Sequence, residues 1–437
     1  MASELDKLVI KYDQPNFKER VTELRLSVFQ GTHFIGEKEQ QLEAILEAVM
    51  ERDDEAVAEY TEKFDGVKLT PERFRITDEE LSNAHKAIDR KLLESIRQAI
   101  KNVEDYQKKI FIVNDKDFGS TGIKYTPIKR VGICVPGSSA PLPSTVIMTA
   151  VPAQVAGVKE IVVVSPPRYK GSIHPVILAT CKELKIKEVY RIGGAQAVMA
   201  LAKGTRTIRN VDKIVGPGNA WVQMAKKKVL GFVGIDSIAG PSEVLIIAND
   251  KANPAWVAAD MLSQAEHAPG GAYLFTISRK IADEVLEELK KQVEQLRRKD
   301  KTIESLEISS GIVIFENINA LIRGANDFAV EHLQIQCGDE SKKIADQINN
   351  AGAIFIGNYS PVAVGDYWAG PSHTLPTGTS ARFFSALSAN DFVKATSIIE
   401  YDKKKLAESA DDIIRLAEAE GLDAHAKSIQ IRMKVRD

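Results

Sequence analysis

The chain is poor in cysteine. Only three of its 437 residues are cysteines, and Cys134, Cys181 and Cys337 follow no paired spacing. This usage excludes a disulfide-stabilised scaffold and is typical of a reducing compartment, so we expect a cytoplasmic protein. Because free cysteine behaves as a small hydrophobe, we expect the three side chains to pack in the core.

Long apolar runs and an excess of positive charge are also missing. No segment holds the roughly eighteen consecutive apolar residues that a membrane-spanning helix needs. Residues 1–13 mix charges with short apolar pieces, unlike a signal peptide. With 58 basic and 60 acidic residues, the formal net charge is -2. We therefore expect neither nucleic acid nor a membrane as a partner.

The composition that remains is that of a globular protein, with 44% hydrophobic and 27% charged residues. A chain of this length exceeds one ordinary core, so two or three domains are expected. Roughly the first hundred residues have helical periodicity, with a capping box from Thr77 to Glu80.

Beyond residue 125, short β-branched runs alternate with amphipathic segments. A first series predicts strands at 131–135, 160–165, 187–192, 211–215 and 233–238. A second series predicts strands at 243–248, 272–277, 311–315, 333–336 and 353–356, with a long helix at 279–298. Strands that alternate with helices form parallel sheets covered on both faces. The predicted fold class is α/β, with two Rossmann-like parallel-sheet domains and helical N- and C-terminal extensions.

Glycine-rich clusters follow several predicted strands, at residues 135–139, 193–196, 216–219 and 239–243. In open parallel sheets the ligand crevice lies beyond the carboxyl ends of the strands, where helix N-termini favour phosphate. Ordinary turn geometry explains any one cluster. Four in succession, two of them ending in the amides Gln196 and Asn219, leave both interpretations open. Neither a G-x-G-x-x-G nor a Walker sequence is present.

Imidazole, amide and carboxylate groups are spread along the second half of the chain. Gln264 and His267 are three positions apart near the end of a predicted helix, so both can reach one ion. Asp366 falls in a predicted strand-end turn, and His425 lies close to the C-terminus. Each feature alone has an ordinary explanation: a hydrogen-bonded surface pair for Gln264 and His267, an Asx turn for Asp366, and a solvent-facing histidine for His425. Together they form an N/O set that suits zinc or a similar divalent ion in a catalytic site with open positions.

Glu331 and His332 supply a carboxylate and an imidazole beside a predicted strand, a reasonable acid/base set. Neighbours on an extended chain point to opposite faces, so the two serve one site only if the backbone bends there. One exposed and one half-buried polar residue is the alternative.

Taken in order, these motifs resemble the histidinol dehydrogenase family. The resemblance covers about residues 131–432 and is carried by the stretches 141–146, 193–197, 211–219, 235–245, 262–267, 331–333 and 365–376. It implies the four-electron oxidation of L-histidinol to L-histidine through L-histidinaldehyde, the last steps of histidine biosynthesis, with two NAD+ used in succession.

The resemblance also implies roles for the residues above. One Zn2+ per subunit would be held by Gln264, His267, Asp366 and His425, with the amino alcohol completing the coordination. The substrate would contact these same four residues together with Ser242, His332 and Glu420. His332 would take protons, and Glu331 would activate water at the aldehyde stage. Cys134, Gln196 and Asn219 would contact NAD+.

Family members are homodimers whose tails cross over, so Glu420 and His425 would complete the partner's site. The expected domains are a helical segment at 1–30, an α/β domain at 31–130 and 242–385 with the metal and acid/base residues, a Rossmann-like NAD-contacting domain at 131–241, and a helical tail at 386–437.

Two departures from the family pattern keep an alternative open. Cys134 stands where members often have tyrosine, and Val330 stands where proline is common. A related NAD-dependent dehydrogenase of another small polar alcohol is therefore the second interpretation. A zinc hydrolase with the same ligands and a non-catalytic metal-dependent scaffold are the third and fourth.

Overall fold

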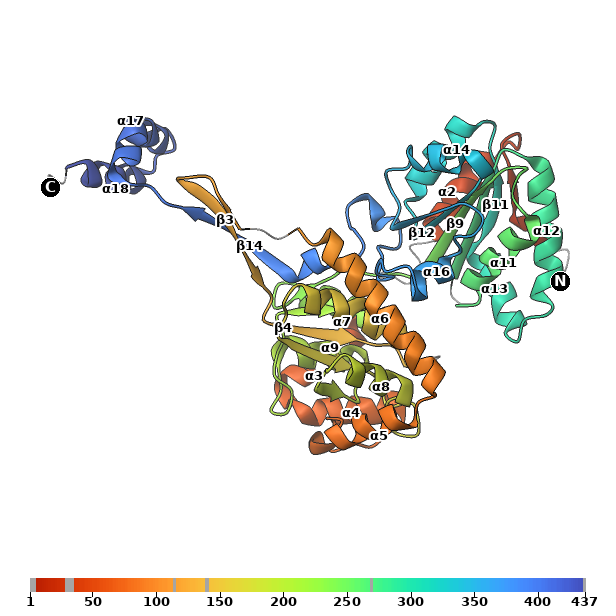
Figure 1. Ribbon diagram of the computed structural model, residues 1–437, viewed down its shortest axis with the longest axis horizontal. Helices are drawn as coiled ribbons and strands as arrows, with labels where there is room; N and C mark the ends of the chain where they lie inside the picture. The colour runs from red at the N-terminus through yellow and green to blue at the C-terminus, as the bar shows by residue number, and fades with distance from the viewer. Residues whose placement is uncertain (1–4, 28–34, 113–114, 138–140, 268–269, 435–437) are drawn as a thin grey trace. The chain divides into compact units, whose positions relative to one another are not determined.

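The computed structural model describes residues 5–27, 35–112, 115–137, 141–267 and 270–434. The chain divides into two compact units (Figure 1), Met1–Phe111 with Ile128–Phe392, and Ile112–Pro127 with Val393–Asp437. Ser138 and Ser139 of the first glycine cluster lie outside the described residues. Among the helices within these ranges, none is both long and apolar enough to cross a membrane.

The first sheet of the larger unit has five parallel strands in the order β6-β5-β4-β7-β8. The strands are β4 (Arg130–Cys134), β5 (Glu160–Val164), β6 (Glu188–Tyr190), β7 (Lys213–Val215) and β8 (Gly234–Ile235). The helices between them are α7 (Pro143–Val155), α8 (Pro175–Glu183), α9 (Gly194–Lys203) and α10 (Ala220–Val229). The first predicted series of strands and helices is therefore confirmed, with boundaries shifted by a few residues.

Helices from the N-terminal part of the chain form an outer layer on this sheet. They are α3 (Glu37–Arg52), α4 (Asp54–Asp65), α5 (Asp78–Ala87) and α6 (Arg90–Ile110). α3 and α4 pack on α9, α5 packs on α8, and α6 packs on α7 (Figure 1). The predicted capping box is present. The Thr77 side chain accepts a hydrogen bond from the Glu80 backbone N–H, and the Glu80 side chain accepts one from the Thr77 backbone N–H.

The second sheet of the same unit is also fully parallel, in the order β1-β11-β10-β9-β12-β13. Its strands are β1 (Val9–Lys11), β9 (Ser242–Ala248), β10 (Gly270–Thr276), β11 (Gly311–Ile314), β12 (His332–Gln336) and β13 (Ala353–Ile356). The accompanying helices are α2 (Phe17–Ser27), α11 (Pro254–Ala265), α12 (Arg279–Val293), α13 (Lys299–Ser309), α14 (Ile318–Phe328), α15 (Ser341–Ala345) and α16 (Val362–Tyr367). The edge strand β1 was predicted as helix; it pairs with β11 because its apolar residues extend the sheet.

Alternation along β9 shows why this sheet is covered on both faces. Val244 and Ile246 pack with α11, α12 and α13, whereas Leu245 and Ile247 pack with α14 and α15. Every residue of β10 is buried. Strands buried on both faces are nearly continuous apolar runs, which is the pattern of the sequence here.

The smaller unit is an antiparallel sheet followed by two helices. β3 (Thr121–Pro127) pairs with β14 (Val393–Ile399) and with β2 (Lys116–Asp117). α17 (Lys403–Ala419) and α18 (Asp423–Lys434) form the helical tail, separated by Gly421 at φ 72°. β14 was not predicted, because the partner that makes it a strand is 270 or so residues away in the sequence.

Candidate active site and cofactor pocket

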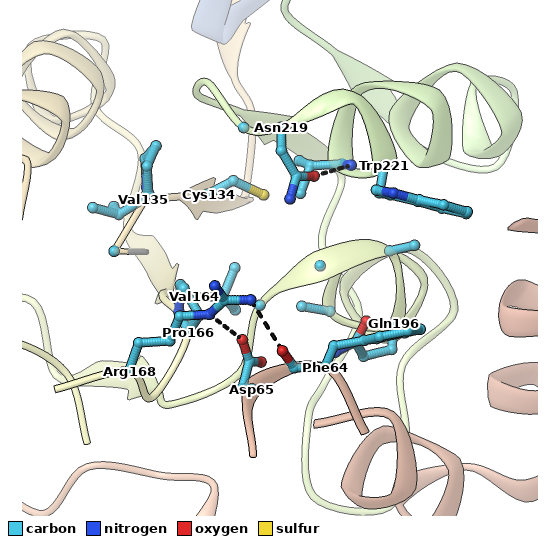
Figure 2. Close-up of a pocket in the computed structure, with 18 of the residues that line it drawn as sticks. Phe64, Asp65, Cys134, Val135, Val164, Pro166, Arg168, Gln196, Asn219 and Trp221 are labelled. Atoms are coloured by element: carbon cyan, nitrogen blue, oxygen red, sulfur yellow. Dashed lines mark hydrogen bonds and ion pairs between the residues drawn. The ribbon is translucent and has the colours of Figure 1, made fainter. Parts of the chain in front are cut away.

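A cavity of about 320 Å³ lies at the carboxyl end of the first sheet (Figure 2). β4 is the first strand of this sheet in the chain and lies between β5 and β7. The chain runs from β4 to β5 and β6 on one side of β4 and then crosses to β7 and β8 on the other side, and such a reversal opens a crevice beyond the strand ends. The lining residues that follow the strands are Cys134–Gly137, Val164, Pro166, Gly193–Ala197 and Pro217–Asn219.

All three predicted cofactor residues line this one cavity: Cys134, Gln196 and Asn219. Burial raises the pKa of Cys134 to about 12, so its thiol is a neutral contact surface. The Asn219 Oδ1 atom accepts the backbone N–H of Val222 at 3.1 Å and caps α10. Three of the four glycine clusters thus contribute to one pocket, whereas the fourth, at residues 239–243, lines another cavity.

Gln196 is the strongest sign of a ligand in this pocket. The residue is only 1% exposed, and its Oε1 and Nε2 atoms have no hydrogen-bond partner within the described part of the chain. A buried amide without partners costs about 1–3 kcal/mol per group. Gly194, at φ 72°, leaves the room that this side chain needs, because a Cβ atom there would lie 2.5 Å from Gln196 Oε1. The arrangement favours a polar molecule that fills the cavity and pairs with the amide.

Two groups that the sequence did not indicate close the rim of the pocket. Arg168 donates from Nε to Asp65 at 2.7 Å and from a terminal nitrogen to the backbone oxygen of Phe64 at 3.0 Å (Figure 2). Trp221, on α10, also lines the cavity. Phe64 and Asp65 come from the end of α4 and belong to no motif, so only the packing of α4 on α9 reveals them.

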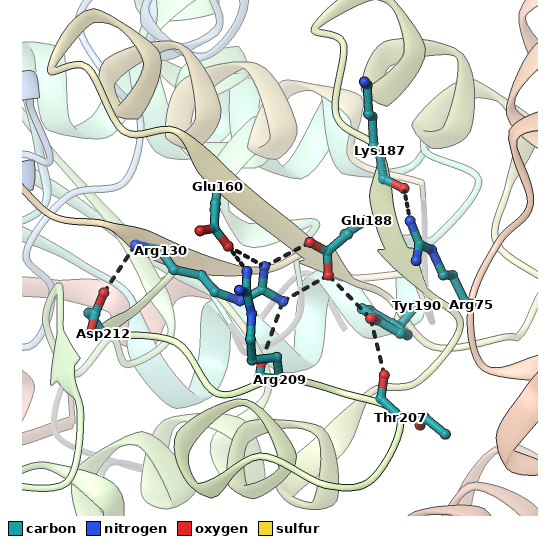
Figure 3. Close-up of polar contacts among 9 residues, drawn as sticks. All are labelled: Arg75, Arg130, Glu160, Lys187, Glu188, Tyr190, Thr207, Arg209 and Asp212. Atoms are coloured by element: carbon teal, nitrogen blue, oxygen red, sulfur yellow. Dashed lines mark hydrogen bonds and ion pairs between the residues drawn. The ribbon is translucent and has the colours of Figure 1, made fainter.

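The amino end of the same sheet is built from ion pairs (Figure 3). Arg130, at the start of β4, donates two hydrogen bonds to Glu188, at 2.7 and 2.8 Å, and one to Glu160 at 3.1 Å. Arg209 pairs with Glu160 as well, and Tyr190 donates to Glu188. The hydrogen bond from Arg130 lowers the pKa of Glu188. These groups bond to one another and hold the starts of three strands together.

The acid/base candidates lie on the second sheet, at the amino ends of its central strands. Ser242 is the first residue of β9 and His332 is the first residue of β12, and the two strands are neighbours. Ala329, in the left-handed region at φ 46°, ends α14 shortly before Glu331. The chain enters β12 through this turn, and His332 Nδ1 lies 3.4 Å from Glu331 Oε2. Glu331 and His332 therefore meet in one site.

Glu331 is held as a carboxylate. Its Oε2 atom accepts from Ser242 Oγ at 2.5 Å and from the backbone N–H of Glu243 at 3.0 Å. Burial would raise the pKa of Glu331, but the charge of His332 and these hydrogen bonds outweigh it, so the pKa is lowered. An ionised carboxylate at this depth can accept a proton or direct a water molecule.

His332 has one nitrogen fixed and the other free. Its Nδ1 atom lies 3.1 Å from the backbone oxygen of Glu243, and since a carbonyl oxygen only accepts, Nδ1 carries a hydrogen. The Nε2 atom lies 3.8 Å from Asp366 Oδ1, too far for a hydrogen bond. Burial would lower the pKa of His332, but Glu331 and Asp366 outweigh it and raise the pKa to about 9. The proton that this residue can exchange is on Nε2.

Asp366 lies in the short helix α16, not in the predicted strand-end turn. Pro361 precedes α16 and Val362 is buried, which favours one helical turn here. Burial raises the pKa of Asp366, against the opposing charges of His332, His373 and His267. His332, Asp366 and His373 line a cavity of about 230 Å³ beside β13.

His373 had no assigned role from the sequence, although it lies in the 365–376 stretch. Its Nε2 atom lies 3.2 Å from Ser144 Oγ, and burial lowers the pKa of the imidazole. The residue therefore presents a neutral imidazole to the wall of this cavity. Its neighbour Ser372 donates to the backbone oxygen of Met148 at 3.0 Å and ties the segment to α7.

The remaining predicted metal residues lie in two places. Gln264 is 2% exposed near the end of α11, and its Nε2 atom is without a hydrogen-bond partner among the residues described. His267 follows two residues after the helix and is exposed. Among the described residues, no group of three or more His, Cys, Asp or Glu side chains is gathered as a metal site. The larger unit contributes only two such side chains to the predicted ligand set, His267 and Asp366, so this finding does not test the set. The zinc ligand set therefore stays a prediction.

Glu420 and His425 belong to the smaller unit, and both are exposed. Glu420 is the C-cap residue that follows α17, and His425 lies in the first turn of α18. Gly421 donates to Glu418 and Leu422 donates to Ala417, which is the bonding of a helix that ends at a left-handed glycine.

Comparison with known proteins agrees with the motifs. The sequence model of histidinol dehydrogenase matches residues 31–433. Histidinol dehydrogenases of Rhodopirellula baltica and Oceanobacillus iheyensis are 47% and 48% identical to the chain, over 90% of its length and over 86% and 93% of theirs. The crystal structure of histidinol dehydrogenase from Elizabethkingia anophelis superposes with a TM-score of 0.89 at 34% identity, covering 98% of both chains.

These matches confirm the predicted α/β fold and the predicted family. They support an oxidoreductase, and they give no support to the hydrolase, the scaffold or the dehydrogenase of another alcohol. The chain belongs to the histidinol dehydrogenase family.

Proposed function

We propose that the chain oxidises L-histidinol to L-histidine at the site between β12 and α16, with NAD+ held in the pocket of the first sheet and Zn2+ beside Asp366. The observation that carries the proposal is the Glu331–His332 pair, whose free Nε2 atom faces Asp366 at 3.8 Å. A buried imidazole with one nitrogen fixed and one available is the arrangement that general acid/base catalysis needs.

The residues of the larger unit fit a zinc ion. Gln264, His267 and Asp366 offer an amide oxygen, an imidazole and a carboxylate, which are donors that zinc accepts in catalytic sites. The Gln264 amide is buried with its nitrogen unpartnered among the described residues, so it is not committed to the fold alone. When bound, the ion would hold the imidazole and amine of histidinol and so fix its alcohol carbon.

His332 and Glu331 would divide the proton transfers. With Nδ1 tied to the Glu243 carbonyl, the Nε2 atom of His332 would accept the alcohol proton when the imidazole is in its neutral form, and it would act again in the second oxidation. Glu331, held as a carboxylate by Ser242 and a backbone N–H, directs water to the aldehyde carbon between the two steps. Ser242 would also contact the substrate.

The proposed path of NAD+ follows from two cavities that share lining residues. Gly218 and Asn219 line the cofactor pocket and also a second cavity, which Ser242 and Glu243 line as well. A dinucleotide whose pyrophosphate lies near the α9 and α10 N-termini would extend past Asn219 toward Ser242. Gln196 and Cys134 would contact it within the first pocket. NAD+ supplies the hydride acceptor.

The last two groups would come from a second copy of the chain. Glu420 and His425 are exposed on α17 and α18, where a partner subunit can use them. In the proposed homodimer, His425 of the partner subunit completes the zinc site and Glu420 of the partner subunit contacts substrate.

The test is the oxidation of histidinol with NAD+, followed by NADH absorbance, before and after a chelator and after zinc is returned. We expect two NADH per histidinol, loss of turnover with chelator, and recovery with zinc. Turnover of histidinol that persists in metal-free protein, or a strong preference for an alcohol without an imidazole, would contradict the proposal.

A further inference from the structure

Glu243, the second residue of β9, contacts the acid/base pair through three different groups. Its backbone N–H donates to Glu331 Oε2 at 3.0 Å, and its backbone oxygen accepts from His332 Nδ1 at 3.1 Å. Its side-chain Oε1 atom accepts the backbone N–H of Glu331 at 3.2 Å. The first two contacts use only the backbone N–H and oxygen of residue 243, which any residue except proline supplies. The third depends on the glutamate side chain.

The same Oε1 atom reaches a third segment. It accepts the backbone N–H of Gly378 at 3.1 Å, in a turn where Gly378 and Thr379 both have positive φ, 59° and 61°. Threonine is strained in this region, so the turn persists only because its surroundings hold it. Thr377 adds a second tie by accepting the Gly240 N–H at 2.5 Å. This turn ends the segment that carries His373 along the cavity wall.

Two buried carboxyl groups beside each other do not both ionise. Burial, and then the charge of Glu331, raises the pKa of Glu243 to about 8, whereas the pKa of Glu331 is lowered. At neutral pH the charge therefore resides on Glu331. Glu243 is a protonated carboxyl that offers one carbonyl oxygen to two backbone N–H groups, which is a task that a glutamine amide can also perform.

We propose that Glu243 is a positioning residue for the oxidation of histidinol: its side chain fixes the backbone of Glu331 against the turn at Gly378 and so directs Glu331 and His332 at the reacting carbon. This inference rests on the proposed roles of Glu331 and His332. Glu243 itself exchanges no proton in the reaction.

The test compares Glu243→Leu with Glu243→Gln in the zinc-loaded protein at neutral pH. In Glu243→Leu both acceptor bonds are lost, and since a displacement of about 1 Å can cost about 100-fold, we expect kcat to fall by about that factor. Zinc content stays unchanged, because none of the predicted zinc ligands is hydrogen-bonded to this side chain. Glu243→Gln keeps the carbonyl oxygen and retains kcat within about threefold.

A matched control is Gln107→Leu. The Gln107 side chain is fully buried and its Oε1 atom accepts the backbone N–H of Ala389 at 2.9 Å, so the change also removes a buried acceptor from a loop. We expect lower stability and an unchanged kcat for Gln107→Leu. If Glu243→Leu does not fold, Glu243→Asp, which withdraws the carboxyl by one methylene, is expected to lower kcat about tenfold with KM unchanged.

Glu331→Gln is measured in parallel to separate the two proposals. Suppose that Glu331→Gln is impaired. The positioning role is then overturned, and the proposed function stays intact, if Glu243→Leu has the wild-type kcat. The same holds if the kcat of Glu243→Gln is as low as that of Glu243→Leu. Wild-type activity in Glu331→Gln overturns both.

Discussion

Apart from the extra edge strand β1 of the second sheet, the two parallel sheets share one strand order, but their candidate sites lie at opposite ends of the strands. In both, the first strand in the series lies at the centre, with the second and third on one side and the fourth on the other. The first sheet has its pocket at the carboxyl ends of the strands and ion pairs at the amino ends. The second sheet has Ser242, Glu331 and His332 at the amino ends of β9 and β12. Strand order alone therefore does not locate a site.

Helix polarity offers a physical reason for the difference. At the carboxyl ends of parallel strands, helices begin, and their N-termini stabilise negative charge such as phosphate. At the amino ends, helices finish, and their C-termini stabilise positive charge. His267 follows the C-terminus of α11, and His332 follows that of α14. An anionic cofactor suits the first environment, and a metal cation with an imidazolium suits the second.

The largest effect is expected for the second sheet. His267→Asn removes an imidazole ligand beside the α11 C-terminus, so we expect zinc content and kcat to fall together, by about 1000-fold in kcat. Metal analysis and NADH assays on the same sample check this. A zinc-free His267→Asn protein with full activity is incompatible with the proposed site.

The next effect concerns the base. His332→Asn keeps a side chain that can donate to the Glu243 carbonyl but has no titrating nitrogen facing Asp366. We expect kcat to fall about 100-fold, with zinc still bound, because general acid/base groups contribute roughly that much. A bound-zinc variant with unchanged kcat would assign the proton transfer to another residue.

A smaller effect is expected at the first sheet. Gln196→Ala removes the buried amide that has no hydrogen-bond partner among the described residues, so we expect the KM for NAD+ to rise about tenfold, the size of one lost polar contact. Thermal stability should stay equal or increase, because the buried wild-type amide makes no hydrogen bond to the described part of the chain. A variant that loses stability but binds NAD+ normally would make Gln196 a structural residue.

The opposite end of that sheet should affect stability only. Arg130→Met leaves Glu188 and Glu160 without their shared cation, and we expect unfolding to become easier by about 3 kcal/mol, with kcat and both KM values unchanged. Urea unfolding and steady-state kinetics measure the two. A changed KM for NAD+ would show that the two ends are not independent.

The same network predicts a pH dependence of stability. Arg130 lowers the pKa of Glu188 below its ordinary 4.5, so the carboxylate stabilises the fold above that pH and the contribution is lost as pH falls further. Wild-type stability should therefore decrease more steeply than that of Arg130→Met below about pH 4.5. If the free energy of unfolding falls equally with pH in the two proteins, Glu188 does not contribute this pH dependence.

Local patterns in the sequence predicted most of the strands and the family, because apolar periodicity and turn residues act over short distances. They did not predict β1 or β14, whose strand form depends on partners far away in the chain. Glu243 was passed over because its hydrogen-bond partners, Glu331 and Gly378, are remote in sequence. The helix that carries Asp366 was missed because one turn of helix has too little periodicity to distinguish it from a loop.

The stoichiometry of NADH release from zinc-loaded Glu331→Gln tests most directly whether the amino-end site of the second sheet performs the chemistry. If Glu331 directs water to the aldehyde, histidinol should yield one NADH rapidly and the second only slowly, while the wild-type protein releases two at one rate. Two NADH released by the variant at the wild-type rate would contradict the account.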